Sequence, residues 1–562
     1  MKPLISEMTL REKIGQCMCF YQYFINQKVE ENENLTRTPE EQKEILEKNP
    51  CGTIWCCGGQ KLKEPAMDEY NWGKYSAPSD EYREWVQRVD SYVPKIHTLR
   101  ATDCEMTGPG STFPDLTLTN GGLTIGGANS EELSYKLGVQ IAKELKMAGI
   151  NWRWAPVCDI VNRFSMSLTR PFTADPDDLI KLSVAHIRGM QENNVAGTAK
   201  HFPGGDRYEY RDDHFTVSMI NSTMEEWWAE QGKVFQGVID GGVYSIMITH
   251  KAFPAADNSK INGKFVPSTL SKKIITDLLK DKMGFKGVVI TDGVNMAALR
   301  ACYPREELYV KLLEAGNDVL LGVENDSIDI IEKAVLEGRL SIERINDACQ
   351  RVLDMKEKLG MFDDDYIVGE DFNQSVIDET VKINTQIAEN AITVVKDIQN
   401  LLPVKKENIK NVTIVVSTHT EVFTENIEQF MKPAFEKRGA KVNVIRRLRS
   451  KQEVEEISEN SDLIVYAGFL IGHIPRGITS FYESEAVTFS HAFSSGKEKS
   501  VGVSMGHPYI HFDMMGNANT FINTYVATPD TMEAFVKAVY GEIDIKGKSP
   551  VDIENPSWLL WD

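Results

Sequence analysis

Residues suited to proton transfer and to hydrogen bonding with vicinal hydroxyl groups are concentrated between positions 200 and 214. Lys200 and His201 are adjacent, and Pro203 with two glycines follows them, a composition typical of a strand that ends in a turn. Asp212 and His214 lie two residues apart, so their side chains point the same way in an extended backbone. A carboxylate beside an imidazole raises the pKa of the imidazole and fixes the tautomer of the ring, which produces a proton shuttle near neutral pH. A solvated acidic loop with an incidental histidine is the alternative interpretation.

A second candidate is Asp292, which follows the apolar run 287–291 and precedes Gly293. A carboxylate at the end of a buried strand can act as a covalent nucleophile. An aspartate that caps the following helix gives the same pattern, so the run alone leaves both interpretations open. The same two interpretations apply to Asp318, within Ala315-Gly316-Asn317-Asp318, and there we expect the structural role.

Side chains so far apart in the sequence must be brought together by the fold. Apolar runs from residue 50 onward alternate with amphipathic segments, which is typical of parallel strands covered by helices. In the segment 130–147, apolar residues recur every four positions, and we expect Asn129 to cap this helix and Gly149 to end it. The expected strands are 52–56, 98–102, 150–154, 196–199, 245–249, 288–291 and 318–321.

Seven strands, with one more that the pattern does not locate, predict an α/β fold with a (β/α)8 TIM-type barrel, followed by a smaller α/β sandwich domain. Asp103, Lys200, His201, His250 and Asp292 all follow predicted strands, and strand ends of a barrel converge on one mouth. An acidic stretch separates the two parts. The predicted division is a catalytic barrel over 1–355, a linker over 356–380 and the sandwich over 381–562.

Composition limits the classes of partner. With 62 basic and 82 acidic residues among 562, the formal charge is -20, which disfavours nucleic acids and anionic membranes. No apolar run is long enough to span a membrane. The nine cysteines include no CxxC pair at zinc spacing, which indicates reduced thiols and no metal site. The N-terminus has no secretory pattern, so we expect a cytoplasmic protein. We also expect a monomer or homodimer, and no cofactor.

A series of motifs, in order along nearly the whole chain, resembles glycoside hydrolase family 3, within it the β-N-acetylglucosaminidase branch. They are the opening helix 8–16, the strand end 155–159 (APVCD), the run 200–204 (KHFPG), the segment 244–254 with Met247, His250 and Pro254, the strand 284–292, and the beginning and end of the second domain at 388–403 and 540–551. The resemblance implies hydrolysis of a small oligosaccharide or glycoside, with release of terminal β-linked N-acetylglucosamine.

Residue by residue, the resemblance implies roles for eight side chains. Asp292 matches the nucleophile that forms a covalent glycosyl-enzyme, His214 the acid/base, and Asp212 the residue that orients it. The implied sugar-binding residues are Asp103, Arg170, Lys200, His201 and His250.

Some positions depart from the branch's pattern. After Asp103-Cys104-Glu105 the usual basic residue is missing, and the loop that leads to Asp212 and Asp213 is long and charged. Three alternatives therefore stay open: a β-glucosidase or β-xylosidase of the same family, with Glu483 or Glu485 as acid/base; a phosphorolytic variant; and an inactive carbohydrate-binding protein.

Overall fold

Eight parallel strands form the first part of the protein. The computed structural model describes residues 2–30, 33–56, 77–93, 96–163, 165, 167–206, 209, 211–418, 420–470, 488, 491–510 and 516–553. The strands are β1 (Met18–Tyr21), β4 (Thr53–Trp55), β5 (Leu99–Thr102), β6 (Trp152–Arg153), β7 (Ala196–Phe202), β8 (Ser245–Ile248), β11 (Val288–Thr291) and β12 (Leu320–Val323). They pair in the order β11-β8-β7-β6-β5-β4-β1-β12. Contacts between the two end strands close this sheet, because the Thr291 amide donates to the Val319 carbonyl at 3.0 Å. The predicted TIM-type barrel is confirmed.

The strand that the sequence pattern does not locate is β1. Its four residues follow α1 (Leu10–Gln16) after a single residue, so the short run MCFY reads as a continuation of the amphipathic helix. Pairing with β4 on one side and β12 on the other buries this strand and completes the barrel.

Helices surround the barrel, and α7 shows how the sequence sets their limits. This helix covers Glu131–Met147, and its N-cap is Ser130, whose hydroxyl accepts from the Leu133 amide. The predicted cap, Asn129, instead has a left-handed backbone (φ 42°) and ends the preceding helix, because asparagine tolerates that conformation. The predicted end is correct, since Gly149 has φ 77°. Leu137, Ile141 and Leu145 are buried on the inner face.

The other helices of this part are α2 (Gln22–Asn26), α3 (Pro39–Lys48), α5 (Ser79–Ser91), α6 (Leu123–Ala128), α8 (Pro176–Gln191), α9 (Met224–Ala229), α10 (Gln231–Asp240), α11 (Ala297–Arg300), α12 (Arg305–Ala315), α13 (Ser327–Leu336), α14 (Ile342–Lys358) and a π-helix, Lys273–Lys282. Two short hairpins accompany them, β2 (Gln27–Glu30) with β3 (Glu33–Thr36) and β9 (Lys260–Ile261) with β10 (Lys264–Phe265). Within the described residues, no helix combines the length and the apolar character needed to cross a membrane.

A second, six-stranded sheet follows. Its strands are β13 (Thr393–Asp397), β14 (Asn411–Thr418), β15 (Lys441–Arg446), β16 (Leu463–Phe469), β17 (Ser500–Ser504) and β18 (Thr520–Asn523), in the order β13-β18-β17-β16-β14-β15. Only β13 runs antiparallel to its neighbour. Neighbouring residues such as Ile414 and Val415 belong to separate cores on opposite faces, so helices pack on both sides as predicted for a sandwich. These helices are α16 (Glu421–Asn426), α17 (Lys432–Glu436), α18 (Lys451–Asn460) and α21 (Pro529–Tyr540).

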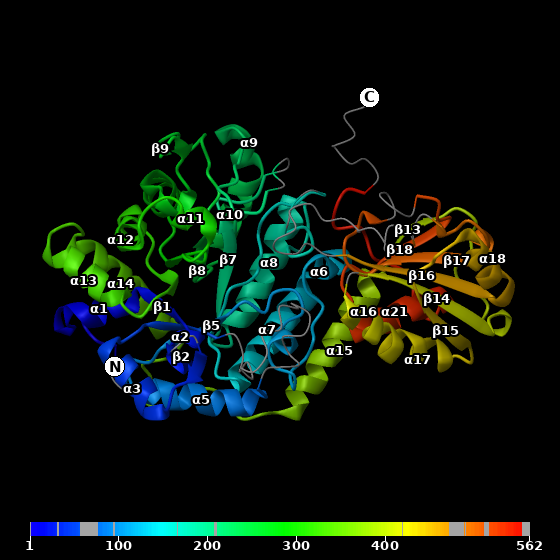
Figure 1. The fold of residues 1–562 in the computed structure, drawn as a ribbon, viewed down its shortest axis with the longest axis horizontal. Helices are drawn as coiled ribbons and strands as arrows, with labels where there is room; N and C mark the ends of the chain where they lie inside the picture. Colours follow the sequence, from blue (N-terminus) through cyan, green and yellow to red (C-terminus); the bar gives the residue numbers. More distant parts are fainter. Residues whose placement is uncertain are drawn as a thin grey trace.

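The helix α15 (Gln374–Ala391) joins the two parts and packs on α6, α7 and α21 (Figure 1). The predicted linker 356–380 therefore includes the beginning of a helix, and the domain limits themselves stay a prediction. Asn384 on α15 binds Asn120 of the barrel through two hydrogen bonds of 2.5 and 2.9 Å. At Gly126 a Cβ atom would lie 1.7 Å from the Phe172 carbonyl oxygen, so only glycine permits this close packing beside the second domain.

Candidate active site

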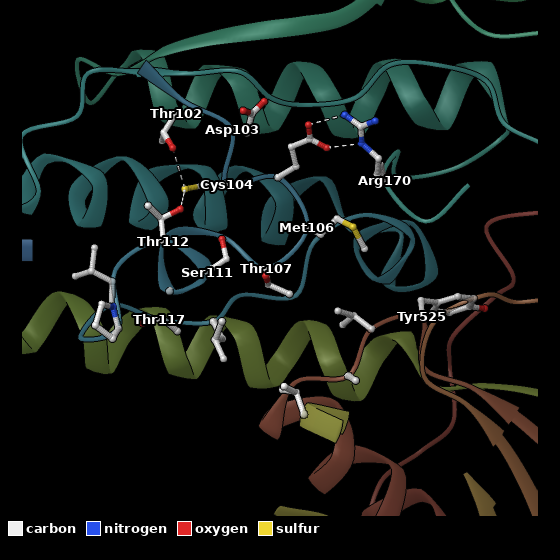
Figure 2. Close-up of a pocket in the computed structure, with 18 of the residues that line it drawn as sticks. Thr102, Asp103, Cys104, Met106, Thr107, Ser111, Thr112, Thr117, Arg170 and Tyr525 are labelled. Atoms are coloured by element: carbon white, nitrogen blue, oxygen red, sulfur yellow. Dashed lines mark hydrogen bonds and ion pairs between the residues drawn. The ribbon is translucent and has the colours of Figure 1, made fainter. Parts of the chain in front are cut away.

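The carboxyl ends of the barrel strands open into a cavity of about 1560 Å³ that extends to the second domain. On the barrel side it is lined by the loop after β5, and on the other side by α15 and Tyr525 (Figure 2). Cys104 in that loop has φ 43° and is held between Thr102 and Thr112, whose hydroxyl oxygens lie 3.5 and 2.9 Å from its sulfur. The loop is thereby fixed in place and presents Asp103 to the cavity.

A chain of alternating charges lies along one wall. Lys200 is 1% exposed, and its ammonium group donates to Asp103 Oδ1 at 2.8 Å and forms an ion pair with Glu105. Arg170 donates to both oxygens of Glu105 at 2.7 Å (Figure 2). Burial raises the pKa of Glu105, but Arg170 and Lys200 outweigh it and hold that pKa well below the usual range. The Asp103 side chain stays 43% exposed, so its carboxylate is accessible from the cavity.

His201 extends this chain. Its Nδ1 lies 2.9 Å from Asp159 Oδ2, and its backbone amide donates to the other oxygen of that carboxylate at 2.9 Å. Burial raises the pKa of Asp159, but the neighbouring His201 more than offsets this, so the net pKa is lowered. A charged Asp159 makes Nδ1 the donor, which directs Nε2 toward Arg170 at 3.4 Å. The side chains of Lys200, Arg170 and His201 are therefore each held by carboxylates or by one another before any ligand binds.

The predicted pair of Asp212 and His214 is brought together by a turn after β7. His214 Nδ1 lies 2.7 Å from Asp212 Oδ1, which also accepts from the His214 amide at 2.9 Å. Burial lowers the pKa of His214, but the hydrogen bond to Asp212 and the charges of Asp292 and Asp213 raise it above its ordinary value. The raised pKa increases the protonated fraction of the imidazole, and the protonated ring can donate from Nε2.

Asp213 has a different partner. Its Oδ2 accepts from Lys251 Nζ and from the Thr249 hydroxyl, both at 2.8 Å, so spacing correctly favours Asp212 as the partner of His214. Atoms of Asp212, Asp213 and His214 lie within 4.8 Å of one another, and among the described residues no other group could gather three metal ligands. Because Lys251 already neutralises one carboxylate and His214 the other, this geometry is suited to proton transfer. The absence of a metal cofactor stays a prediction.

Asp292 is held at the end of β11. Its amide donates to the Ile248 carbonyl at 3.0 Å, and its Oδ1 accepts from the Gly293 amide at 2.7 Å. Burial raises the pKa of this carboxyl, but neighbouring histidines, chiefly His201, lower it by more, so the net pKa lies below its ordinary value. The carboxylate is charged at neutral pH, and its second oxygen is available as a nucleophile.

His250 does not line the cavity, although the sequence analysis predicts it as a sugar-binding residue. It is fully buried, with Nδ1 3.0 Å from the Thr269 hydroxyl and Nε2 2.9 Å from the Gly293 carbonyl. Burial lowers its pKa, so the ring is neutral, donates from Nε2 and accepts at Nδ1. Since both nitrogens have protein partners, this histidine supports the Asp292–Gly293 backbone instead of contacting a ligand.

Of the other predicted residues, Asp103, Arg170, Lys200, His201, His214 and Asp292 line the cavity, whereas Asp212 does not and is buried beside His214. Glu105, Asp159 and Lys251 also belong to the site and are not among the predicted residues. The alternation in Asp103-Cys104-Glu105 is a local signal for Glu105, whereas Lys251 carries none. Glu483 and Glu485, the alternative acid/base residues, lie outside the described part of the chain.

Comparison with known proteins supports the sequence resemblance. Residues 9–355 match the glycosyl hydrolase family 3 N-terminal domain. The chain is 25% identical over 470 residues to a Cellulomonas fimi protein named beta-N-acetylglucosaminidase/beta-glucosidase, which covers 80% of this chain and 83% of that protein.

Solved structures show the same fold over nearly the full length. A beta-glucoside phosphorylase, BglX, bound to 2FGlc superposes with a TM-score of 0.82 at 24% identity and covers 98% of this chain and 95% of that one. A family 3 beta-N-acetylglucosaminidase from Paenibacillus sp. str. FPU-7 gives a TM-score of 0.78 at 22% identity and covers 97% and 99%.

Proposed function

Because the chain belongs to glycosyl hydrolase family 3, we propose that it is a retaining, exo-acting β-N-acetylglucosaminidase. The observation that carries this proposal is that His214, hydrogen-bonded to the buried Asp212, lines the same cavity as the charged Asp292. A retaining mechanism needs a nucleophile and a separate proton donor, and these residues supply both. The C. fimi relative, whose name includes this activity, supports the choice of sugar.

In the first step, a free oxygen of Asp292 attacks the anomeric carbon while the bond to the leaving oxygen breaks. Protonated His214 transfers its Nε2 proton to that oxygen, so the leaving group departs as a neutral alcohol. The raised pKa of His214 keeps the donor form populated, and Asp212 stabilises the imidazolium until the proton moves.

In the second step, neutral His214 removes a proton from water, and the water oxygen attacks the anomeric carbon. The bond to Asp292 breaks, and the sugar is released with its original configuration. Meanwhile Asp103, Arg170, Lys200 and His201 bind the terminal sugar. A carboxylate and cations with fixed orientations can accept from and donate to neighbouring hydroxyls without reorganising.

The test is the hydrolysis of 4-nitrophenyl β-glycosides by the purified protein. We expect the N-acetylglucosaminide to give the highest kcat/KM, and the released sugar to keep the β configuration by NMR. Strong activity on the glucoside or xyloside with none on the N-acetylglucosaminide would replace the proposal with the β-glucosidase or β-xylosidase alternative. Activity on none of the three would favour an inactive carbohydrate-binding protein.

Phosphorolysis is a second candidate because the proposed acid/base is a histidine. A carboxylate in this position would repel an incoming phosphate, whereas an imidazole does not. In this variant a phosphate oxygen takes the place of water, and the products are a sugar 1-phosphate and the free aglycone. Added inorganic phosphate would then raise turnover and divert the product to sugar 1-phosphate.

A further inference from the structure

A second cavity, of about 580 Å³, adjoins the active site on the side of the barrel away from the second domain, where α2 and α12 lie (Figure 1). Tyr21, Trp55 and Glu324 mark its base at the ends of β1, β4 and β12. Aromatic side chains dominate its wall: Tyr21, Tyr23, Phe24, Trp55, Tyr303 and Tyr309. We propose that this aromatic cavity is where the enzyme binds the leaving group of its substrate, a group with a flat apolar face. This proposal deepens the proposed function and rests on it.

The two cavities adjoin each other. Trp55 and Asn295 line both of them. Gly322 lies between these residues, since a Cβ atom there would be 3.9 Å from Trp55 Cζ3 and 3.9 Å from Asn295 Oδ1. Gly322 therefore adds no side chain where the two cavities adjoin.

The boundary between the two cavities lies close to Asp292 and His214. Asn295 follows Asp292 by three residues, and its Oδ1 would lie 2.9 Å from a Cβ atom at Gly293. The Ala297 amide donates to the His214 carbonyl at 3.0 Å, which holds the proton donor against the loop that carries Asn295. A leaving group that accepts its proton from His214 therefore emerges next to the entrance of the aromatic cavity.

The chemistry of the wall defines the ligand. Trp55 packs edge-on against Tyr21 with ring centroids 4.8 Å apart, and Tyr21 is 6.2 Å from Phe24, so the rings form a supported cluster. The charge of Arg305 is neutralised by ion pairs with Glu324 and with Asp326, the latter at 2.6 Å. Arg300 also lines the cavity, so the charged residues of its wall are Arg300, Arg305 and Glu324. The aromatic rings of the wall favour a leaving group with a flat apolar face: a second pyranose, which has one apolar face, or an aryl group.

The test compares substrates that share a sugar and differ in the leaving group. For wild type, Tyr303→Ala and Tyr23→Ala, kcat/KM is measured on a β-linked disaccharide, a 4-nitrophenyl β-glycoside and the β-glycosyl fluoride, all built from whichever sugar wild type releases. Fluoride is too small to reach the aromatic cavity. We expect each alanine variant to lose roughly 10-fold on a substrate with a ring as leaving group and nothing on the fluoride.

Tyr303→Phe is the matched control, because it keeps the ring and should retain wild-type kcat/KM on all three substrates. A loss on the disaccharide identifies a pyranose as the ligand, and a loss on the nitrophenyl glycoside alone identifies an aryl group. Equal losses on the fluoride, or no loss on any substrate, would overturn the proposal. Val381 lines the main cavity on the side of the second domain. A loss in Val381→Ala that is confined to the substrates with a ring as leaving group would also overturn the proposal.

Failure of the proposed function is distinguishable from failure of this inference. A wild-type preference for glucose or xylose refutes the N-acetylglucosaminidase assignment but leaves the comparison of leaving groups intact. The comparison depends only on the ratio between substrates of one sugar.

Discussion

Replacement of Asp212 by asparagine tests whether this carboxylate keeps His214 protonated. The substitution preserves size but removes the charge from the 2.7 Å contact with Nδ1. A hydrogen bond to a charged group contributes about 1.5–3 kcal/mol, which corresponds to about 10- to 150-fold in the protonation equilibrium of the imidazole. Because the pKa of His214 is raised in the folded protein, the donor form prevails at low pH and is lost as the pH rises.

In Asp212→Asn the alkaline limb of the kcat/KM profile should therefore move to lower pH. Near neutral pH, activity on an alkyl glycoside should fall about 10- to 100-fold. On a 2,4-dinitrophenyl glycoside the dinitrophenolate departs without being protonated, so kcat/KM for that substrate should change little. Asp213→Asn is the matched control: it removes one of the charges that raise the pKa of His214 but keeps the hydrogen bond to Asp212, so it should displace the alkaline limb by less. An unchanged alkaline limb in Asp212→Asn, or an equal displacement in Asp213→Asn, would refute the reasoning.

Three further substitutions test the rest of the site. Asp292→Ala should lower kcat by roughly 10³-fold or more with the fold intact by circular dichroism, because the nucleophile is lost; near-normal activity would contradict the mechanism. Lys200→Met leaves Glu105 and Asp103 without their shared cation, and urea titration should show a loss of about 3 kcal/mol in unfolding free energy; a loss below about 1 kcal/mol would mean that Arg170 compensates. His250→Gln should lower kcat about 10-fold with KM unchanged, since the residue supports the nucleophile without touching substrate; a rise in KM alone would show direct binding.

The prediction of the site from the sequence is correct where residues are close in the sequence. Asp212 and His214 are two positions apart, and Lys200 and His201 are adjacent, so strand and turn geometry alone places these side chains. The alternation of apolar runs with amphipathic segments similarly predicts the barrel, and it failed only for Met18–Tyr21, four residues that directly follow a helix.

The prediction from the sequence is less accurate for residues whose environment depends on distant parts of the chain. His250 follows a strand like the true members of the cavity, but Thr269 and Gly293 occupy its two nitrogens. Glu105 has only its alternation with Asp103 as a local signal, whereas its ion pairs with Lys200 and Arg170, which make it the centre of the charged wall, come from distant strands and loops.

The sequence by itself determined the elements and the chemically competent residues, because periodicity and spacing are properties of neighbouring positions. Only the tertiary structure decided which of these residues meet. Asp103 and Lys200 are 97 positions apart, and the barrel brings their charged atoms to 2.8 Å. The aromatic cavity behind Trp55 is likewise built from separate strand ends and helices. Distances between elements are set by how side chains pack across the whole core, and that packing is not encoded in any single segment.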